Sequence, residues 1–542
     1  MMRTPAYEDI QLEGEIAFRI MRNFTRVEEL KYRPESIFEE DKGGWPGDFE
    51  GRTILALVLL SRVTGRRAAY LDKILIALKE NLNNRGYLKE ILPEGIYNEQ
   101  QLSGHNWLLR GLLEYYIWTG KEEIADMAKG IVKNLFLPVR GHYRHYPVDP
   151  TLRNCDGGAA GHIAEDAVNR WYLSTDIGCA FISMDALSQY YEIFEDPQVA
   201  DLLEEMAETF MTIDFIKSHM QTHASLSACR GLIRYYRCTG KKEILRFVID
   251  FFELYQRNGM TENYANYNWF GKPLWTEPCA IVDSYLLAVE LFKETKDVSY
   301  LETANYIFYN ALGFAQRNNG GFGCDACVGS EEAGSFLAIK EELYEAYWCC
   351  SMRGAEGLSA AAINSVLTAE KQVYFNHYYN GEYRMSTIHM KVATSFPEEG
   401  RIQINLMKNI GTNKFHFFVP LGINKATVSL TLQGVPLEYA WEGGFLTAEL
   451  TGCGEVILTF DITLQKKSRV SQNPSFGSVT FWHGVLLLGV KTDKIIHIDG
   501  NIAVYCSNGV YEVGDVLLEP INRSIYKERE TLTEEKLQLL FD

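Results

Sequence analysis

Four side chains in two short segments offer a ligand set for a borderline-soft metal ion. Glu277 and Cys279 stand two positions apart in WTEPCAIVDSY, and Cys349 and Cys350 are adjacent in YWCCSMRGAEG. Three thiolates and one carboxylate suit the tetrahedral preference of zinc. Adjacent cysteines bridge each other poorly, because a disulfide needs well-separated Cα atoms. The spacing is unlike that of a zinc finger, so a set of buried, inert cysteines is the alternative interpretation.

Further candidates lie in connecting segments that are rich in glycine and aromatic residues. Glu262, in TENYANYNW, precedes Glu277 and is a third acidic candidate; its alternative is a solvated loop carboxylate. Cys324 and Cys327 form a lone CxxC in GFGCDACVG, which is weak evidence for a metal or redox site, so ordinary reduced thiols are favoured. Three aromatic side chains could stack on a sugar face or pack as loop hydrophobics: Tyr267, Trp269 and Trp275.

Repeated helical hairpins account for the first two-thirds of the chain. Apolar residues recur at i, i+3, i+4 and i+7 in paired runs, and a glycine often ends the first run, as in RVTGRR, IWTGKEE and RCTGKKE. Such repeats predict either an open solenoid or a closed toroid of inner and outer helices. The long aromatic connections favour the toroid, because they resemble loops around a mouth. The turns are expected at Thr64, Thr119, Glu195, Thr239 and Thr295.

The pattern changes near Leu367. Alternating β-branched and aromatic runs follow, such as RIQINLM, KFHFFVPL and EVILTFDITL, separated by clusters of Gly, Asn and Asp. This pattern is typical of an antiparallel β-sandwich. We expect a helical domain over residues 1–370 and a β-sandwich domain over residues 371–542, with residues 465–478 as a candidate junction between two β-layers.

Composition excludes several classes of partner. The chain has 542 residues and a net charge of −18, which argues against nucleic acid or an anionic membrane surface, since both require basic patches. The N-terminus lacks the apolar core of a signal peptide, and no run approaches the roughly 18 apolar residues of a membrane span. Eleven cysteines without a secretion signal indicate reduced thiols and a cytoplasmic protein.

The order of helical hairpins, TEPCA, the cysteine pair and a β-rich C-terminal region resembles glycoside hydrolase family 127, the β-L-arabinofuranosidases and their relatives. Glu277 and Cys279 fall on the family's glutamate and cysteine, and Cys349 and Cys350 on its cysteine pair. Glu262 falls on a family glutamate, one residue closer to that motif than in family members. The resemblance implies a mainly α chain with an (α/α)6 toroid followed by an antiparallel β-sandwich.

The resemblance also implies a retaining glycoside hydrolase of β-L-arabinofuranosidase type that uses Zn²⁺. In that reading Glu277, Cys279, Cys349 and Cys350 hold the zinc. Cys349 is the nucleophile that forms a thioglycosyl intermediate, and Glu262 is the acid and then the base. A nearby metal lowers the pKa of a thiol from about 8.5, which favours the nucleophilic thiolate. Retaining hydrolysis normally sets the acid and the nucleophile about 5–5.5 Å apart.

The sugar is less well defined. His105 in LSGHNW and His223 in QTHASL fall on family segments that contact the sugar; a satisfied structural histidine is the alternative for each. Relatives carry another histidine on a helix that reads STDIGCAFISMDALSQYY here and lacks one. For Asp48 and Glu50, in WPGDFEGR, a capping or solvated role is favoured over a place at the mouth.

Two alternatives to this function stay open. One is the same mechanism acting on a different sugar, and the other is a noncatalytic carbohydrate-binding protein with a structural zinc site. The expected partner is a small carbohydrate or an oligosaccharide, and the β domain could support an oligomer.

Overall fold

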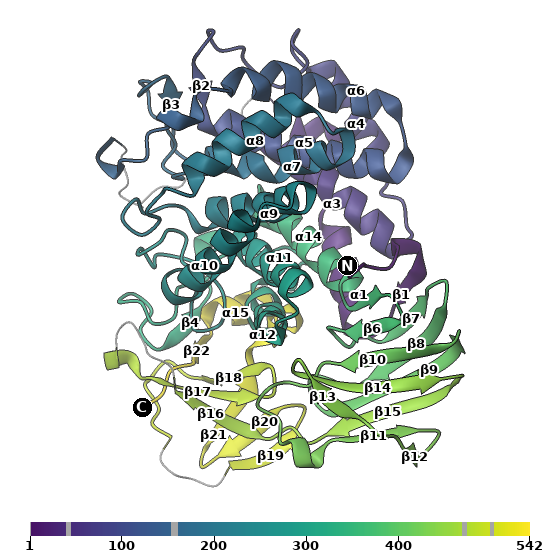
Figure 1. Cartoon of the computed structure of the whole chain (residues 1–542). Coiled ribbons are helices and arrows are strands. Elements are labelled where there is room, and N and C mark those ends of the chain that lie inside the picture. The colour runs from purple at the N-terminus through teal and green to yellow at the C-terminus, as the bar shows by residue number, and fades with distance from the viewer. Residues whose placement is uncertain (1, 40–44, 153–160, 469–473, 499–502) are drawn as a thin grey trace.

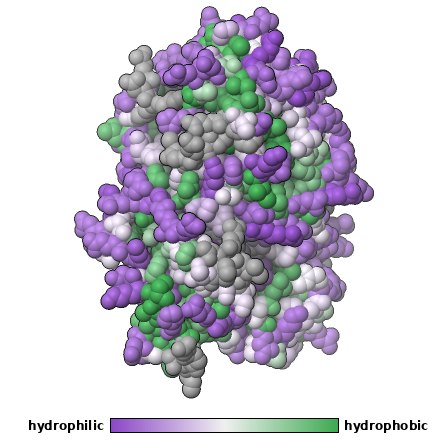
Figure 2. Space-filling model, turned by 90° about the vertical axis from the view of Figure 1, so that its left-hand side faces the viewer, coloured by the Kyte–Doolittle hydropathy of each residue, from purple (hydrophilic) through white to green (hydrophobic). Residues whose placement is uncertain are grey.

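A computed structural model describes residues 2–39, 45–152, 161–468, 474–498 and 503–542. The helices form one body and the C-terminal β-strands lie below it in the view of Figure 1, with the N-terminal strand β1 (Ile10–Leu12) among them. Within the described residues, no helix combines the length and the apolar character needed to cross a bilayer. On the face shown in Figure 2, hydrophilic residues cover most of the surface and hydrophobic residues form separate patches among them.

Five consecutive helical hairpins follow one another along the chain, each with a long buried inner helix and an outer helix. The outer helices bury one stripe; in α10, for example, Ile244, Val248, Phe252 and Tyr255 are buried at helical spacing. The predicted turns are confirmed, because the inner helices end at or next to the five expected residues. The pairs are α3 (Asp48–Thr64) with α4 (Leu71–Asn81), α5 (Glu99–Thr119) with α6 (Glu122–Ile131), α7 (Ser183–Phe194) with α8 (Pro197–Phe210), α9 (Thr222–Thr239) with α10 (Lys242–Asn258), and α11 (Pro278–Thr295) with α12 (Val298–Tyr306).

The sixth hairpin joins helices that are far apart in the sequence. Its inner helix is α14 (Cys350–Ile363), and α1 (Gly14–Arg26) packs against it. The Asn23 side chain of α1 donates hydrogen bonds to the carbonyl groups of Gly320 and Ser351, both at 2.9 Å. Because α14 also contacts both α11 and α3, the six inner helices close into a ring. The predicted (α/α)6 toroid is therefore confirmed.

Glycines allow α3 and α5 to lie very close together in this ring. A Cβ atom on Gly51 would stand 2.0 Å from the backbone nitrogen of Leu108, and one on Gly111 would stand 2.9 Å from the carbonyl oxygen of Gly51. Only glycine leaves room for such a backbone contact. This crossing fixes the first two inner helices relative to each other, and both carry polar residues into the centre of the toroid.

The C-terminal strands form three sheets. One sheet has the order β1-β7-β8-β9-β15-β11-β12, and a second has the order β13-β14-β10-β6-β5, in which β6 and β10 run parallel. All other pairs in these two sheets are antiparallel. The strands are β5 (Val366–Ala369), β6 (Gln372–Phe375), β7 (Gly381–Arg384), β8 (Ile388–Thr394), β9 (Gly400–Asn409), β10 (Thr412–Phe417), β11 (Ser429–Leu432), β12 (Val435–Pro436), β13 (Ala440–Glu442), β14 (Phe445–Thr451) and β15 (Gly454–Phe460).

The third sheet connects the β region to the toroid. Strand β22 (Lys536–Gln538) pairs both with β18 and with β4 (Phe336–Ala338), a strand that precedes α14 in the chain. Residues 465–478, the expected junction between two β-layers, contain most of β16, the short turn Pro474–Phe476 and residues 469–473, which lie outside the described residues. The other strands of this sheet are β16 (Leu464–Ser468), β17 (Val479–His483), β18 (Leu486–Lys491), β19 (Ala503–Ser507), β20 (Val510–Val513) and β21 (Val516–Pro520).

Candidate active site

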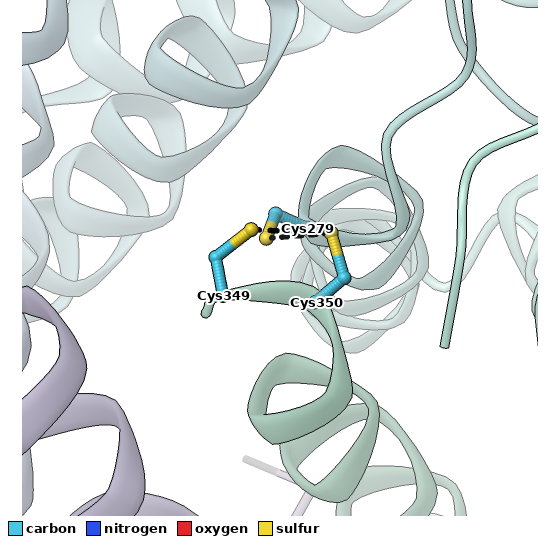
Figure 3. A group of neighbouring side chains, drawn as sticks. All are labelled: Cys279, Cys349 and Cys350. Atoms are coloured by element: carbon cyan, nitrogen blue, oxygen red, sulfur yellow. Dashed lines mark hydrogen bonds between the residues drawn. The ribbon is translucent and has the colours of Figure 1, made fainter. Parts of the chain in front are cut away.

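Three cysteine sulfur atoms meet where α11 and α14 begin. Cys350 Sγ lies 3.3 Å from Cys349 Sγ and 3.7 Å from Cys279 Sγ (Figure 3). Cys350 is the first residue of α14, and Cys349 precedes it with φ −143° and ψ −57°. The chain turns between the two residues, so that both sulfur atoms face Cys279. All three thiols are free, and their sulfur atoms lie within 4.8 Å of one another.

Glu277 and His223 extend this cluster on one side. Ligand atoms of His223, Glu277 and Cys279 also lie within 4.8 Å of one another, so Cys279 belongs to both groups. The backbone N–H of Glu277, which stands just before α11, donates to Asn266 Oδ1 at 2.9 Å. Its side-chain Oε2 is buried and has no hydrogen-bond partner. A buried carboxylate oxygen without a donor is unfavourable, and a bound cation would stabilise it.

The four predicted ligands thus fall in two groups that share Cys279, and the second group adds His223, which was predicted to contact sugar. Burial raises the pKa of the Glu277 carboxyl to about 8, and the negative charge of Asp176 contributes. Burial also raises the pKa of the Cys279 thiol well above its usual value. Both shifts describe the chain without metal, in which a buried negative charge has no cation beside it.

Arg52, which the sequence did not single out, supplies a positive charge to this cluster. Its Nη1 lies 3.5 Å from Cys279 Sγ, and its Nη2 donates to His223 Nε2 at 3.4 Å. Its Nε donates to Asp48 at 2.9 Å, and the guanidinium lies 4.1 Å from the centroid of the Trp107 ring. The i, i+4 spacing of Asp48 and Arg52 on α3 is the signal that could have revealed the pair.

Asp48 and Glu50 both depart from the solvated role favoured by the sequence. Asp48 is 8% exposed and is paired with Arg52 in the first turn of α3. Glu50 is 7% exposed, and burial raises its pKa to about 7. Both residues therefore belong to the protein interior at the start of the helix.

Asp283, one helical turn beyond Cys279, fixes the orientation of His223. Its carboxylate accepts hydrogen bonds from His223 Nδ1 at 2.7 Å, Ser227 Oγ at 2.6 Å and Arg230 Nη1 at 2.6 Å, and it also pairs with Arg353. Burial raises the pKa of Asp283, but the two guanidinium groups lower it further, and the net pKa is well below the usual range. Because Nδ1 carries the proton, His223 Nε2 is the unprotonated nitrogen. Burial lowers the pKa of His223 to about 4, so the ring is neutral at pH 7.

Glu262 lies at a tight turn beside the CxxC loop. The turn is closed by a hydrogen bond from Thr261 N–H to the carbonyl of Ala265, at 3.1 Å. Glu262 is 7% exposed, so the alternative of a solvated loop carboxylate is wrong. A Cβ atom on Gly329 would stand 3.8 Å from Glu262 Oε1 and 3.9 Å from the Leu540 side chain, so the C-terminal segment after β22 also borders this turn.

The CxxC loop packs against the same region. Thr276 N–H donates to the carbonyl of Asp325, and Asp325 N–H donates to Thr276 Oγ1, both at 2.9 Å. Cys327 Sγ lies 3.7 Å from the Asn266 carbonyl oxygen, and the Cys324 thiol interacts with the Cys350 thiol. Both cysteines are free and buried, in agreement with reduced thiols. No motif had indicated that Cys324 borders the cluster.

The structure places His105 and the three aromatic candidates for sugar contact as follows. His105 is fully buried; its Nδ1 donates to the Gln101 carbonyl at 2.8 Å, and its Nε2 accepts from Leu88 N–H at 3.0 Å. Both ring nitrogens are thus used within the protein, and the alternative of a structural histidine describes this residue. Trp269 is 2% exposed and Tyr267 is 5% exposed, whereas Trp275 is half-buried and packs edge-on against Trp269 at 5.0 Å. Trp269 is therefore a packing residue.

Comparisons with known proteins support the architecture. No protein-family profile matches the sequence, and no curated protein does. Three solved structures match nearly the whole chain: a GH127 β-arabinofuranosidase (TM-score 0.73, 13% identity, 100% of this chain and 98% of that chain), a glycoside hydrolase (0.70, 13%, 100% and 97%) and a GH127 β-L-arabinofuranosidase from Geobacillus stearothermophilus T6 (0.68, 10%, 98% and 99%). The resemblance to family 127 is confirmed at the level of the fold, and this chain has the architecture of these β-arabinofuranosidases.

Proposed function

We propose that the protein is a retaining glycoside hydrolase that acts on β-L-arabinofuranosides. The observation that carries the proposal is the cluster of Cys279 with Cys349 and Cys350, together with Glu277, whose carboxyl group lies beside the same Cys279. Similar solved structures that extend over the whole chain are named as β-arabinofuranosidases, which supports the choice of substrate. The partner is accordingly a small carbohydrate or an oligosaccharide.

Zinc is the metal that suits the ligand set. Glu277, Cys279, Cys349 and Cys350 would hold it, and the unpartnered Oε2 of Glu277 is the observation that favours a cation at this place. Three sulfur atoms and one carboxylate match the ligand preference of zinc rather than that of calcium or magnesium. When bound, the ion supplies positive charge that keeps a thiol ionised at neutral pH.

The reaction takes place in two steps carried by Cys349 and Glu262. In the first step, Cys349 Sγ forms a bond to the anomeric carbon as the bond to the leaving oxygen breaks, and Glu262 gives its proton to that oxygen. In the second step, Glu262 takes a proton from water, the water oxygen attacks the anomeric carbon, and the carbon–sulfur bond breaks. Two displacements at one carbon retain its configuration.

Arg52 and Asp283 support the cluster from the interior. Arg52 places a fixed positive charge 3.5 Å from Cys279, where negative charge accumulates when the thiols ionise. Asp283 holds His223 in one tautomer, with the unprotonated nitrogen toward Arg52. The arrangement is buried and therefore pre-organised before the substrate binds.

The experiment is hydrolysis of p-nitrophenyl β-L-arabinofuranoside by reduced, zinc-loaded protein. Removing a covalent nucleophile lowers kcat by roughly a thousand-fold or more, so Cys349→Ala should lose nearly all turnover. Cys453→Ala, at an exposed cysteine of the β region, is the matched control and should keep wild-type activity. Proton NMR of the first product formed reports the anomer. Turnover near wild type in Cys349→Ala, or release of the inverted anomer, would contradict the mechanism.

A further inference from the structure

Asp176 is held rigidly beside the start of the inner helices. It lies in the segment that leads into α7, and its backbone N–H donates to Ser174 Oγ at 3.1 Å. Gln100, on the first turn of α5, donates to Ser174 Oγ at 3.1 Å and to the carbonyl of Gly161 at 2.7 Å. Strand β2 (Tyr97–Asn98), just before α5, also pairs with β3 (Trp171–Tyr172) in the same segment. The position of Asp176 is therefore set by α5 rather than by a free loop.

One oxygen of the Asp176 carboxyl group has no partner. The carboxyl accepts a hydrogen bond from the backbone of Gly161. The other oxygen, Oδ1, is buried without any hydrogen bond, and the residue is only 5% exposed. Leaving such an acceptor unsatisfied costs about 1–3 kcal/mol, and more when it is charged. A residue fixed by its neighbours and left with one open acceptor is prepared for a ligand that donates a hydrogen bond.

Asp176 lies near two residues of the candidate metal site, His223 and Glu277. The carbonyl of Ile177 accepts a hydrogen bond from Gln221 N–H at 3.1 Å, two residues before His223. The negative charge of Asp176 raises the pKa of the Glu277 carboxyl, and this effect is larger than the lowering caused by Arg52.

Two neighbouring carboxylates have other roles. Asp48, whose negative charge contributes to the raised pKa of Asp176, is paired with Arg52. Glu277 belongs to the proposed metal ligands. Asp176, by contrast, has neither a cation among the described residues nor a role in the two proposed steps, and its Oδ1 has no partner.

We propose that Asp176 Oδ1 accepts a hydrogen bond from a hydroxyl group of the sugar that reacts with Cys349, and so selects sugars that carry a hydroxyl at that ring position. This inference rests on the proposed glycosidase function and adds a specificity-determining residue to it. Sugar hydroxyls are hydrogen-bond donors, and the carboxyl group of Asp176 can only accept when it is ionised. A buried acceptor that loses its donor discriminates strongly against a substrate without that hydroxyl.

The test compares Asp176→Asn with the wild type on p-nitrophenyl β-L-arabinofuranoside and on its 2-deoxy, 3-deoxy and 5-deoxy analogues. Asparagine keeps the shape and the acceptor for Gly161 but removes the charge. We expect kcat/KM for the intact sugar to fall roughly 10- to 100-fold, the value of a hydrogen bond to a charged group. For one deoxy analogue, kcat/KM of the wild type should fall by a similar factor relative to the intact sugar. On that analogue kcat/KM of the variant should fall no further than it does on the intact sugar, because the variant and the missing hydroxyl remove the same contact.

Asp166→Asn is the matched control, since Asp166 is exposed in the same segment, and its kcat/KM should stay within about twofold of wild type. Bound zinc, measured by elemental analysis, should be the same in all three proteins. Equal losses on every analogue would indicate a merely structural role, and loss of zinc would make Asp176 a metal residue. Either result, or an unchanged kcat/KM, would overturn the inference.

Failure of the proposed function can be recognised separately. A wild-type protein that hydrolyses none of these glycosides would contradict the glycosidase proposal. Calorimetric titration with L-arabinose would then still test Asp176, because binding does not require turnover. Weaker binding by Asp176→Asn than by the wild type supports the contact, whereas equal binding, or no binding by either protein, overturns it.

Discussion

Replacing Asp283 by asparagine should destabilise the centre of the toroid strongly. Asp283 is fully buried and receives four donors, from His223, Ser227, Arg230 and Arg353. Asparagine is neutral, and its amide group would present N–H donors to two of these donors. The change therefore removes the charge that compensates the guanidinium groups and creates a clash between donors.

The size of the effect follows from the charges around Asp283. The inner helices bury four guanidinium groups and three carboxylates that pair with one another: Arg110, Arg230, Arg234 and Arg353 with Asp185, Asp283 and Glu356. Arg110 and Arg234 have further partners in Glu114 and Glu192, whereas Asp283→Asn removes a carboxylate that Arg230 and Arg353 share. Removing one member of a buried ion pair costs about 3–5 kcal/mol. We expect the free energy of unfolding to fall by that amount.

Guanidinium denaturation of the reduced, metal-free protein, followed by circular dichroism and by tryptophan fluorescence, measures this change. Asp201→Asn is the control, because Asp201 forms an exposed pair with Arg140 at 3.5 Å and should change stability by less than about 0.5 kcal/mol. The double variant Asp283→Asn with Arg353→Met should recover part of the loss, since it removes one of the uncompensated cations. If the free energy of unfolding of Asp283→Asn lies within about 1 kcal/mol of that of the control, the arginines of the network do not depend on the Asp283 charge.

Three further outcomes are expected. The free energy of unfolding should fall as the pH falls from about 6.5 toward 4. Burial lowers the pKa of His105 to about 4 and that of His377 to about 3, so only the unfolded chain takes up protons at these residues in that range. His377→Gln should reduce the slope of the unfolding free energy against pH, and an unchanged slope would contradict this cause. Zinc added to chelator-treated, reduced protein should raise the melting temperature, and Cys279→Ser should remove most of that rise; an equal rise in the variant would place the metal elsewhere. Gly51→Ala should lower the free energy of unfolding by about 1–3 kcal/mol or more, because the added Cβ atom clashes with α5. Gly130→Ala, which has open space around it in α6, should raise that free energy by about 0.4–1 kcal/mol. Thermal denaturation measures both changes.

Local sequence patterns predicted the elements of the fold but not how the ring closes. Helical periodicity and the glycine caps at Gly65, Gly120 and Gly240 are local signals, and they located five hairpins. The sixth pairs α14 with α1, and nothing in either segment points to the other. The pairing of β4 with β22 was missed for the same reason, since a strand of three residues has no periodicity of its own.

At the candidate site, too, the sequence indicated local motifs but not contacts between distant segments. Cys279, Cys349 and Cys350 were found because their residue types and motif are visible in the sequence. The positions of Arg52 and Asp176 depend on packing between helices, so neither stood out. His105 was predicted to contact sugar, and the structure gives both of its ring nitrogens partners within the protein. A motif identifies a residue type, but only the packing around it decides whether the side chain faces a cavity or the core.

The pairing of β22 with β4 also sets when the site can be completed during synthesis. The hairpins and the cysteine pair leave the ribosome well before residue 536, and domains generally fold in the order in which they emerge. Leu540, which follows β22, packs beside Gly329 at the turn that carries Glu262. A chain that stops before β22 would carry the sulfur cluster without the segment that borders the turn of Glu262. Such chains would hold the proposed nucleophile without the segment that borders the proposed acid, so the proposed hydrolysis would depend on residues that follow β22.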